Sequence, residues 1–208
     1  MKERPILMST TMIQAILDGR KTQTRRVIKL SRSWFDENGK LLDTNYWKGE
    51  DLVKTIKCPY GQVGDHLWCK ETWASDCTCE NPECNGVIYK AGYAGKIIPD
   101  KWRPSIFLPR KFSRITLEIT EIRVQRVQEI SLEDADAEGV SVYDSTGDYG
   151  DVLDYRTLWN KINGKIRNRK FTLDDKSNKH WLKEQVGEYS WKSNPWVWAI
   201  TFKVIRQQ

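Results

Sequence analysis

Residues 115–127 constrain the fold more than any other part of the chain. Apolar side chains alternate there at Ile115, Leu117 and Ile119, and the alternation then changes phase to Ile122 and Val124. Strict alternation predicts a β-strand with one buried face, and a change of phase indicates a bulge that bends the strand. Long strands bent in this way are typical of small barrels, whose sheets turn corners at bulges. We therefore expect an α+β fold with a small β-barrel rather than a flat sandwich.

Three further strands and three short helices are expected around this segment. The clearest strand follows from unbroken apolar alternation over residues 196–204, and shorter strands are predicted at 22–28 and 66–73. Capping residues predict one helix over about 10–18, with Gly19 just past its end, and a second between Ser131 and Gly139. A third helix is predicted by apolar residues at helical spacing over 155–162. We expect one α+β domain over residues 1–208.

Segments without a sustained period interrupt this pattern. We interpret them as insertions at about 31–57, 74–104 and 165–194. The chain has 208 residues, which is enough to bury a core without disulfides or an obligatory metal. No apolar run approaches the roughly 20 residues that cross a bilayer, and Met1 to Pro5 lack the apolar stretch of a signal peptide. We therefore expect a cytoplasmic protein that makes no membrane contact.

The charge of the chain favours a polyanionic partner. The net charge is +6, and cations gather around residues 20–29, 103–114 and 165–170. Clusters of this kind attract nucleic acid, although an ordinary basic surface has the same composition. Aromatic residues next to cations, as in Trp102–Arg103, can stack on unpaired bases. Charge and aromatic content therefore make nucleic acid a candidate partner.

The run from Ile16 to Arg25, with sequence ILDGRKTQTR, resembles the signature of the ASCH family, in which a helix ends in Gly-x-Lys and is followed by Thr and Arg. The order of later segments is also similar to that family: Gly64–Asp65 before a strand, a helix ending at Gly139, and a closing strand. Further pieces resemble a phage and prophage branch: CPYG at 58–61, LWCKETW at 67–73, WRPS at 102–105 and NPWVW at 194–198. The resemblance implies a PUA-like barrel flanked by short helices, with a cleft between them.

The resemblance also implies candidate site residues. In an amidohydrolase branch of the family the working residues correspond to Lys21, Thr24 and Glu138. A desolvated lysine can act as the base that activates a threonine hydroxyl, and a glutamate can pass a proton to the leaving amine. In the alternative interpretation, Lys21 and Glu138 form an ion pair between two helix ends and Thr24 is an ordinary strand residue. A regular strand would place Lys21 and Thr24 on opposite faces unless a turn lies between them.

A wider set of residues is expected to contact a ligand or nucleic acid at the cleft and its rim. It consists of Arg20, Arg25, Arg26, Glu71, Trp102, Arg103 and Arg110.

A cysteine-rich segment predicts a structural zinc site. Cys77, Cys79 and Cys84 fall within eight residues of one another, and Cys58 is the best candidate for a fourth ligand. Bound zinc would contribute its binding energy to the folding of an otherwise irregular insertion. The spacing differs from standard zinc motifs, so free thiols remain the alternative. No organic cofactor is expected.

Three functions remain open from the sequence. The first is binding of RNA, single-stranded nucleic acid or a modified nucleobase in a basic cleft. The second is a hydrolase, either an amidohydrolase acting on acylated cytidine-like nucleosides or a ribonuclease. The third is a phage accessory protein that binds a host protein. The sequence leaves the oligomeric state open.

Overall fold

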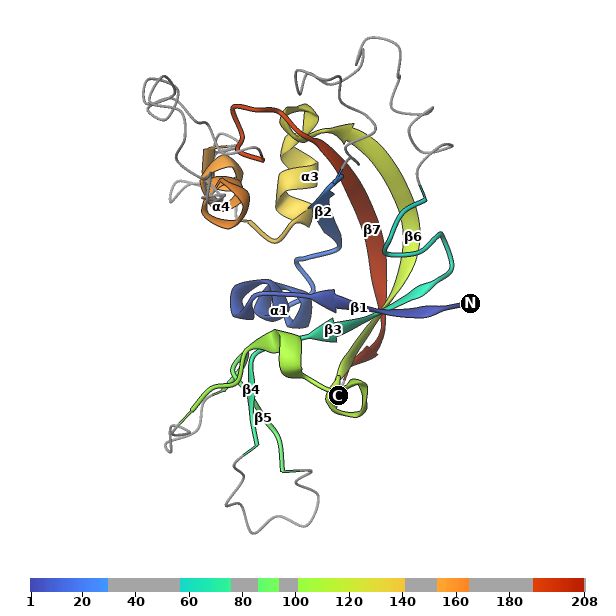
Figure 1. The fold of residues 1–208 in the computed structure, drawn as a ribbon, viewed down its shortest axis with the longest axis vertical. Helices are drawn as coiled ribbons and strands as arrows, with labels where there is room; N and C mark the ends of the chain where they lie inside the picture. Colours follow the sequence, from blue (N-terminus) through green and yellow to red (C-terminus); the bar gives the residue numbers. More distant parts are fainter. Residues whose placement is uncertain (30–56, 76–85, 94–100, 141–152, 165–188, 208) are drawn as a thin grey trace, which may run out of the picture.

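The computed structural model describes residues 1–29, 57–75, 86–93, 101–140, 153–164 and 189–207 (Figure 1). The fold is mixed α+β, with a core made mostly of sheet and few helices. The elements follow in the order β1 (Glu3–Leu7), α1 (Thr10–Leu17), β2 (Gln23–Val27), β3 (His66–Lys70), β4 (Trp73–Ala74), β5 (Ile88–Tyr89), η2 (Ser105–Phe107), η3 (Arg110–Phe112), β6 (Ile115–Arg126), η4 (Val127–Glu129), α3 (Leu132–Ala137), α4 (Leu153–Asn163) and β7 (Trp196–Gln207).

Five strands form one sheet in the order β1-β3-β6-β7-β2. β1 is parallel to β3, and the other neighbours are antiparallel. β6 and β7 are paired along twelve residues each and curve together through the molecule (Figure 1). Their register shifts between Thr116 and Leu117 and again between Ile119 and Glu121. The second shift lies where the apolar alternation changes phase, so the predicted bulge is confirmed.

The expected α+β class is confirmed, and within the residues that the structure describes the sheet is open and curved, with no closed barrel found. β1 and β2 are its two edges. Instead of a backbone ladder, the Arg26 side chain links them, since its NH2 donates to the Leu7 carbonyl oxygen at 2.6 Å. The two edges are thus joined by a side chain, with a gap between them that direct backbone pairing of β1 with β2 would have closed.

The main core lies inside the curve of the sheet and is covered by α1. Ile13 and Ile16 of α1 are buried against strand residues such as Leu117 and Ile200. The Ser9 hydroxyl caps the helix by accepting from the Met12 amide at 3.2 Å, as its sequence position predicts. The chain leaves α1 through Gly19, whose φ of 74° suits glycine. The predicted first helix is therefore confirmed.

A second, smaller core lies between the sheet and the helices α3 and α4 (Figure 1). Tyr155 and Trp159 of α4 and Ala135 of α3 are buried in it together with Val197 of β7. The Ser131 hydroxyl caps α3 by accepting from the Asp134 amide at 3.2 Å. Both predicted helices are therefore confirmed, and α4 begins two residues before the predicted start.

The region predicted to be one strand at 66–73 and then an irregular insertion is organised differently. β3 ends at Lys70, and a separate hairpin pairs β4 with β5, Trp73 with Tyr89. This hairpin has its own apolar cluster of Trp73, Val87 and Leu108. The remaining parts of the predicted insertions lie largely outside the described residues. No helix in the described part of the chain is long and apolar enough to span a membrane.

Candidate functional site

Lys21 and Glu138 meet in the interior, although they are 117 residues apart in the sequence. The Lys21 ammonium donates to the Glu138 Oε2 at 2.7 Å, to the Glu138 carbonyl oxygen at 2.8 Å and to the Gln23 carbonyl oxygen at 2.6 Å. The exposed fractions of the Lys21 and Glu138 side chains are 0% and 3%. An ammonium has three hydrogens to donate, so these acceptors use all of them. The pair is therefore a buried ion pair in which every Lys21 donor has an acceptor.

The pair is extended by charged residues of β2 and α3. Arg25 donates from NH2 to the Asp134 Oδ2 at 2.5 Å and from NH1 to the Glu138 Oε1 at 3.4 Å. Gln23 lies on the same face of β2 as Arg25 and donates from Nε2 to the Asp134 Oδ1 at 3.0 Å. Arg123 of β6 donates to both oxygens of that carboxylate, at 3.1 and 3.3 Å. Three cations and two carboxylates therefore form one network that joins α3 to the sheet.

The backbone brings the ends of α1 and α3 close enough for this pairing. The Thr22 amide donates to the Ala137 carbonyl oxygen at 2.8 Å, and the Lys21 amide donates to the Ala15 carbonyl oxygen at 3.0 Å. Gly139 follows α3 with φ of 80°, and a Cβ there would lie 2.7 Å from the Ala15 Cβ. The glycine after α3 is therefore required both by its conformation and by close packing.

Burial and charge shift the pKa values of this network in defined directions. Burial lowers the pKa of Lys21, because it disfavours the ammonium, and the neighbouring Glu138 carboxylate opposes that effect. Burial by itself raises the pKa of Asp134. The hydrogen bond from Gln23 and the charges of Arg25 and Arg123 outweigh it and hold that pKa below its ordinary value. The Asp134 carboxylate is therefore stabilised in its ionised form.

Thr24 lies apart from the Lys21–Glu138 pair. It follows Gln23 along a regular strand and pairs with Ile200, so its side chain is on the opposite face of β2 from Gln23 and Arg25. Thr24 is buried, yet its hydroxyl is not among the partners of the Lys21 ammonium. The structure thus brings together Lys21 and Glu138, and it does not place the Thr24 hydroxyl where Lys21 could deprotonate it.

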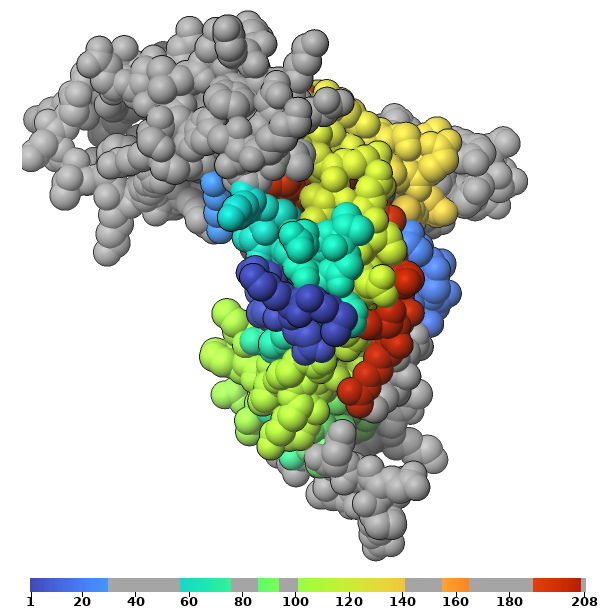
Figure 2. Space-filling model, turned by 90° about the vertical axis from the view of Figure 1, so that its right-hand side faces the viewer, coloured from blue at the N-terminus to red at the C-terminus, as the bar shows by residue number. Residues whose placement is uncertain are grey.

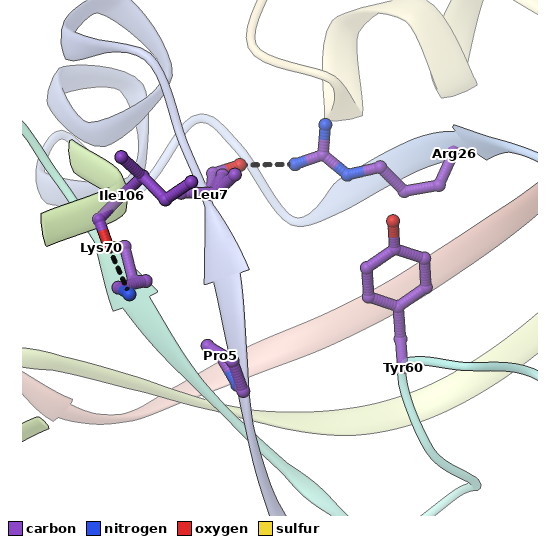
Figure 3. Close-up of a pocket in the computed structure, with 6 residues that line it drawn as sticks. All are labelled: Pro5, Leu7, Arg26, Tyr60, Lys70 and Ile106. Carbon is purple, nitrogen blue, oxygen red and sulfur yellow. Dashed lines mark hydrogen bonds between the residues drawn. The ribbon is translucent and has the colours of Figure 1, made fainter. Parts of the chain in front are cut away.

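A cavity of about 310 Å³ lies at the gap between the two edge strands. It is lined by Pro5, Leu7, Arg26, Tyr60, Lys70 and Ile106 (Figure 3). Arg26 comes from β2, Pro5 and Leu7 from β1, and Tyr60 from the loop that precedes β3. Two of the described lining residues are cations and none of them is acidic, so the cavity favours an anionic or electron-rich ligand.

Polar groups at this cavity keep hydrogen-bonding capacity. Arg26 uses the Leu7 carbonyl oxygen and the Met8 Sδ as acceptors, and Lys70 uses the Ile106 carbonyl oxygen at 2.5 Å. A guanidinium has five N–H donors and an ammonium three. The Tyr60 hydroxyl points toward Arg26 (Figure 3), and within the described residues it has no hydrogen-bond partner. Unlike the Lys21 ammonium, Arg26 and Lys70 therefore have N–H donors that no described residue accepts.

The other predicted contact residues lie at separate places in the structure, some exposed and some buried. Arg20 is exposed and pairs with Asp18 at 2.8 Å. Glu71 is buried and accepts two hydrogen bonds from Arg114, at 3.0 and 2.9 Å, so it has a structural partner. Trp102, Arg103 and Arg110 lie in or beside the segment of η2 and η3. Arg110 pairs with Glu3 at 2.9 Å, and the Arg103 guanidinium lies 5.0 Å from the centre of the Trp73 ring. Of the predicted contact residues, Arg26 alone lines the cavity.

The predicted zinc ligands fall mostly outside the described residues, which include Cys58 but not Cys77, Cys79 or Cys84. Cys58 is a half-buried free thiol whose pKa is raised by burial. Where the structure gives positions, no three His, Cys, Asp or Glu side chains gather as metal ligands. The zinc site stays a prediction that rests on the three clustered cysteines.

Of the cavity residues that sequence reasoning missed, Tyr60 and Lys70 are the two with polar side chains. Both lie within segments that carried the family resemblance, CPYG and LWCKETW, so a local signal was present. Their convergence with Arg26 depends on the placement of the loop before β3 against the far edge of the sheet, which local sequence does not encode.

Comparison of the chain with models of known families, with curated proteins and with solved structures finds no significant match.

Proposed function

We propose that the protein binds RNA or another single-stranded nucleic acid and holds one unstacked base in the cavity between β1 and β2. One observation carries this proposal: Arg26, Lys70 and Tyr60 converge on a cavity of about 310 Å³, where some of their donors have no partner and no lining residue is acidic among the residues that the structure describes. Single-stranded nucleic acid is recognised by aromatic side chains that stack on bases and by cations that contact phosphates. The cavity offers both kinds of group within one site.

Each lining group has a role in this proposal. The Tyr60 ring and the apolar Leu7 and Ile106 side chains provide surfaces for the faces of a base, and the free donors of Arg26 reach its carbonyl or ring-nitrogen acceptors. Lys70 lies at the rim and contacts the phosphate that follows. Each stacked base contributes roughly 1–3 kcal/mol. The specificity in this arrangement comes from the base edge and the affinity from the phosphates.

The family assignment belongs to the same proposal. We propose that the fold is a PUA-like ASCH domain whose barrel is open at the β1–β2 gap. Support comes from Lys21 and Glu138, which the resemblance pairs in one site and which lie 2.7 Å apart. Further support comes from the strongly curved sheet and from the short helices that flank it (Figure 1). In this proposal the buried network positions β2, and through β2 it positions Arg26.

Salt-dependent binding with a matched pair of lysine variants tests the binding proposal. The affinity for a fluorescent single-stranded RNA is measured at two ionic strengths for wild type, Lys70→Met and Lys161→Met; Lys161 is an exposed lysine of α4. We expect Lys70→Met to weaken binding and to reduce the slope of log affinity against log salt by about 0.7, the value for one phosphate contact on a single strand. Lys161→Met keeps the wild-type slope. Wild type that fails to bind at low salt, or equal effects of both variants, contradicts the proposal.

Substitution of the ring tests the base contact separately. Tyr60→Phe keeps the stacking surface, whereas Tyr60→Leu removes it. We expect Tyr60→Leu to weaken binding by about five- to a hundredfold, which corresponds to one lost stacked base, and Tyr60→Phe to bind within about threefold of wild type. Equal affinity of the two variants would show that no base stacks on this ring.

A hydrolase is the second candidate, and the buried Lys21–Glu138 pair favours it. The lowered pKa of Lys21 is the property that a lysine base needs. This chemistry requires Lys21 first to give a proton to the Glu138 carboxylate, so that its neutral amine can accept the proton of the Thr24 hydroxyl. It also requires the Lys21 and Thr24 side chains to move together, because the structure places them apart. Release of acetate from an acetylated cytidine is measured for wild type and for Thr24→Val, which replaces the hydroxyl by a methyl of similar size. Activity in wild type that is lost in Thr24→Val supports this function, and an inactive wild type removes it.

A further inference from the structure

The short turn η2 presents two large apolar side chains to solvent. Ile106 is 56% exposed and Phe107 is 65% exposed. The turn is held by hydrogen bonds from the Phe107 amide to the Pro104 carbonyl oxygen and from the Leu108 amide to the Ser105 carbonyl oxygen, and Leu108 is buried. The buried leucine anchors the turn, so the two exposed residues are held outward rather than able to fold back. Adjacent exposed apolar side chains on an anchored turn indicate a contact surface.

The chain around this turn is basic. Within the described residues 86–93 and 101–114 the charged side chains are all cations, and these are Lys90, Lys101, Arg103, Arg110, Lys111 and Arg114. Two of them are paired with carboxylates elsewhere, Arg110 with Glu3 and Arg114 with Glu71. Arg103 and Lys111 lie over aromatic rings, at 5.0 and 4.7 Å from the ring centres, and have no carboxylate partner among the described residues. The surface around η2 therefore complements a polyanion.

The turn is continuous with the cavity. Ile106 lines the cavity, and its carbonyl oxygen accepts from the Lys70 ammonium. Lys70 and Arg110 both lie over the ring of Trp68, at 5.3 and 5.8 Å from its centre. Figure 2 shows the bright green segment that contains the turn directly beside the dark blue amino-terminal strand, which forms another wall of the cavity. Ile106 therefore connects the cavity to the turn, and the exposed Phe107 follows it in the chain.

We infer that a single strand whose base occupies the cavity continues across η2, where Phe107 stacks a neighbouring base and Arg103 and Lys111 contact phosphates. This inference rests on the proposed function and extends the site from one nucleotide to a short strand. The exposed Phe107 ring supplies a sequence-independent π-surface, which is how single-strand binding proteins hold successive bases. A lipid surface would also accept an apolar turn flanked by cations, but continuity with the cavity favours the strand.

Binding of ligands of two lengths tests the inference. The probes are uridine monophosphate, which fills only the cavity, and an oligouridylate of about eight nucleotides, a length within the usual site size of single-strand binding modules. The variants are Phe107→Leu, which keeps an apolar side chain and removes the ring, and Phe107→Trp, which keeps a ring. We expect Phe107→Leu to weaken oligouridylate binding by about five- to a hundredfold and to leave the binding of uridine monophosphate unchanged. Phe107→Trp binds both probes as wild type does.

The outcomes separate this inference from the proposed function. If Tyr60→Leu leaves both probes bound normally while Phe107→Leu weakens the longer one, the cavity proposal fails and the role of Phe107 in stacking stands. If Phe107→Leu binds oligouridylate as tightly as wild type, the inference is overturned. A vesicle assay gives a second way to overturn it, with vesicles of phosphatidylcholine and phosphatidylserine. If wild type binds these vesicles, Phe107→Leu does not, and oligouridylate fails to displace them from wild type, the turn is a lipid contact and the inference is overturned.

Discussion

Removal of the Glu138 carboxylate is the sharpest test of the buried network. The change is Glu138→Leu, which leaves the Lys21 ammonium without its carboxylate and the Arg25 guanidinium with the Asp134 carboxylate and the neutral Gln23 Oε1 as acceptors. Both members of the Lys21–Glu138 pair are essentially inaccessible to water, so the remaining ammonium cannot be solvated. Breaking a buried pair in this way costs about 3–5 kcal/mol. For a chain of this size that loss corresponds to a melting temperature lower by about 6–20 °C.

A double variant distinguishes an uncompensated charge from lost packing. Lys21→Met with Glu138→Leu replaces both charges by apolar groups of similar volume, and such replacements are often neutral or stabilising. We expect the double variant to recover at least half of the stability lost in Glu138→Leu. Urea denaturation followed by tryptophan fluorescence measures both values. The control is Glu118→Leu, which breaks the exposed pair of Glu118 with Lys203 at 3.1 Å and is expected to cost less than about 1 kcal/mol.

Two results would refute this reasoning. Glu138→Leu that costs no more than Glu118→Leu would mean that water reaches the Lys21 ammonium in solution. A double variant whose loss equals the sum of the two single losses would mean that Lys21 and Glu138 are not energetically coupled.

Two further predictions concern backbone fit and alkaline stability. Gly139→Ala is expected to lower the free energy of unfolding by about 2 kcal/mol or more, because a Cβ there collides with Ala15 at 2.7 Å and Lys21 at 3.0 Å and also strains the positive φ. In the control Gly19→Ala nothing lies within 4 Å of the new Cβ, so only the strain remains, at about 1 kcal/mol. Equal losses of the two variants in urea denaturation would contradict the packing argument. Burial raises the pKa of the Cys69 thiol from 9.0 to about 12. The contribution of the buried neutral thiol to stability is therefore complete below pH 9 and is lost as pH rises toward 12, because the thiol of the unfolded chain ionises first. Between pH 7.5 and 10.5 wild type is expected to lose about 2 kcal/mol more than Cys69→Val, and parallel pH profiles of the two would exclude this cause.

The fold could be predicted from sequence where one residue pattern determines one local structure. The phase change between Ile119 and Ile122 predicted the bulge, because side-chain period and strand register are directly linked. Ser9 predicted the start of α1 because a cap is a local hydrogen bond. β1 was not predicted, since Pro5 and charged neighbours obscure its alternation; as an edge strand it tolerates a proline.

The candidate site was predictable only in part, because its contacts are between distant segments. The meeting of Lys21 with Glu138 was expected from a resemblance between motifs, and nothing in the spacing of 117 residues would indicate it. The cavity depends on five segments that converge only in the folded chain, around residues 5, 26, 60, 70 and 106. The open sheet was missed because closure depends on whether the two edge strands reach each other, and neither strand carries that information alone.

The place of β2 in the sheet has a consequence for how the chain folds during synthesis. β2 is completed at Val27, and its neighbour among the described strands is β7, which begins at Trp196. At about 5–20 residues per second, the ribosome adds the segment between them in roughly 8 to 34 seconds. The partners of Lys21 and Arg25 on α3 and at its end, Glu138 and Asp134, are synthesised well before β7. Ion pairs can therefore attach β2 to α3 before β2 joins the sheet, and truncations within β7 leave β2 without this partner strand.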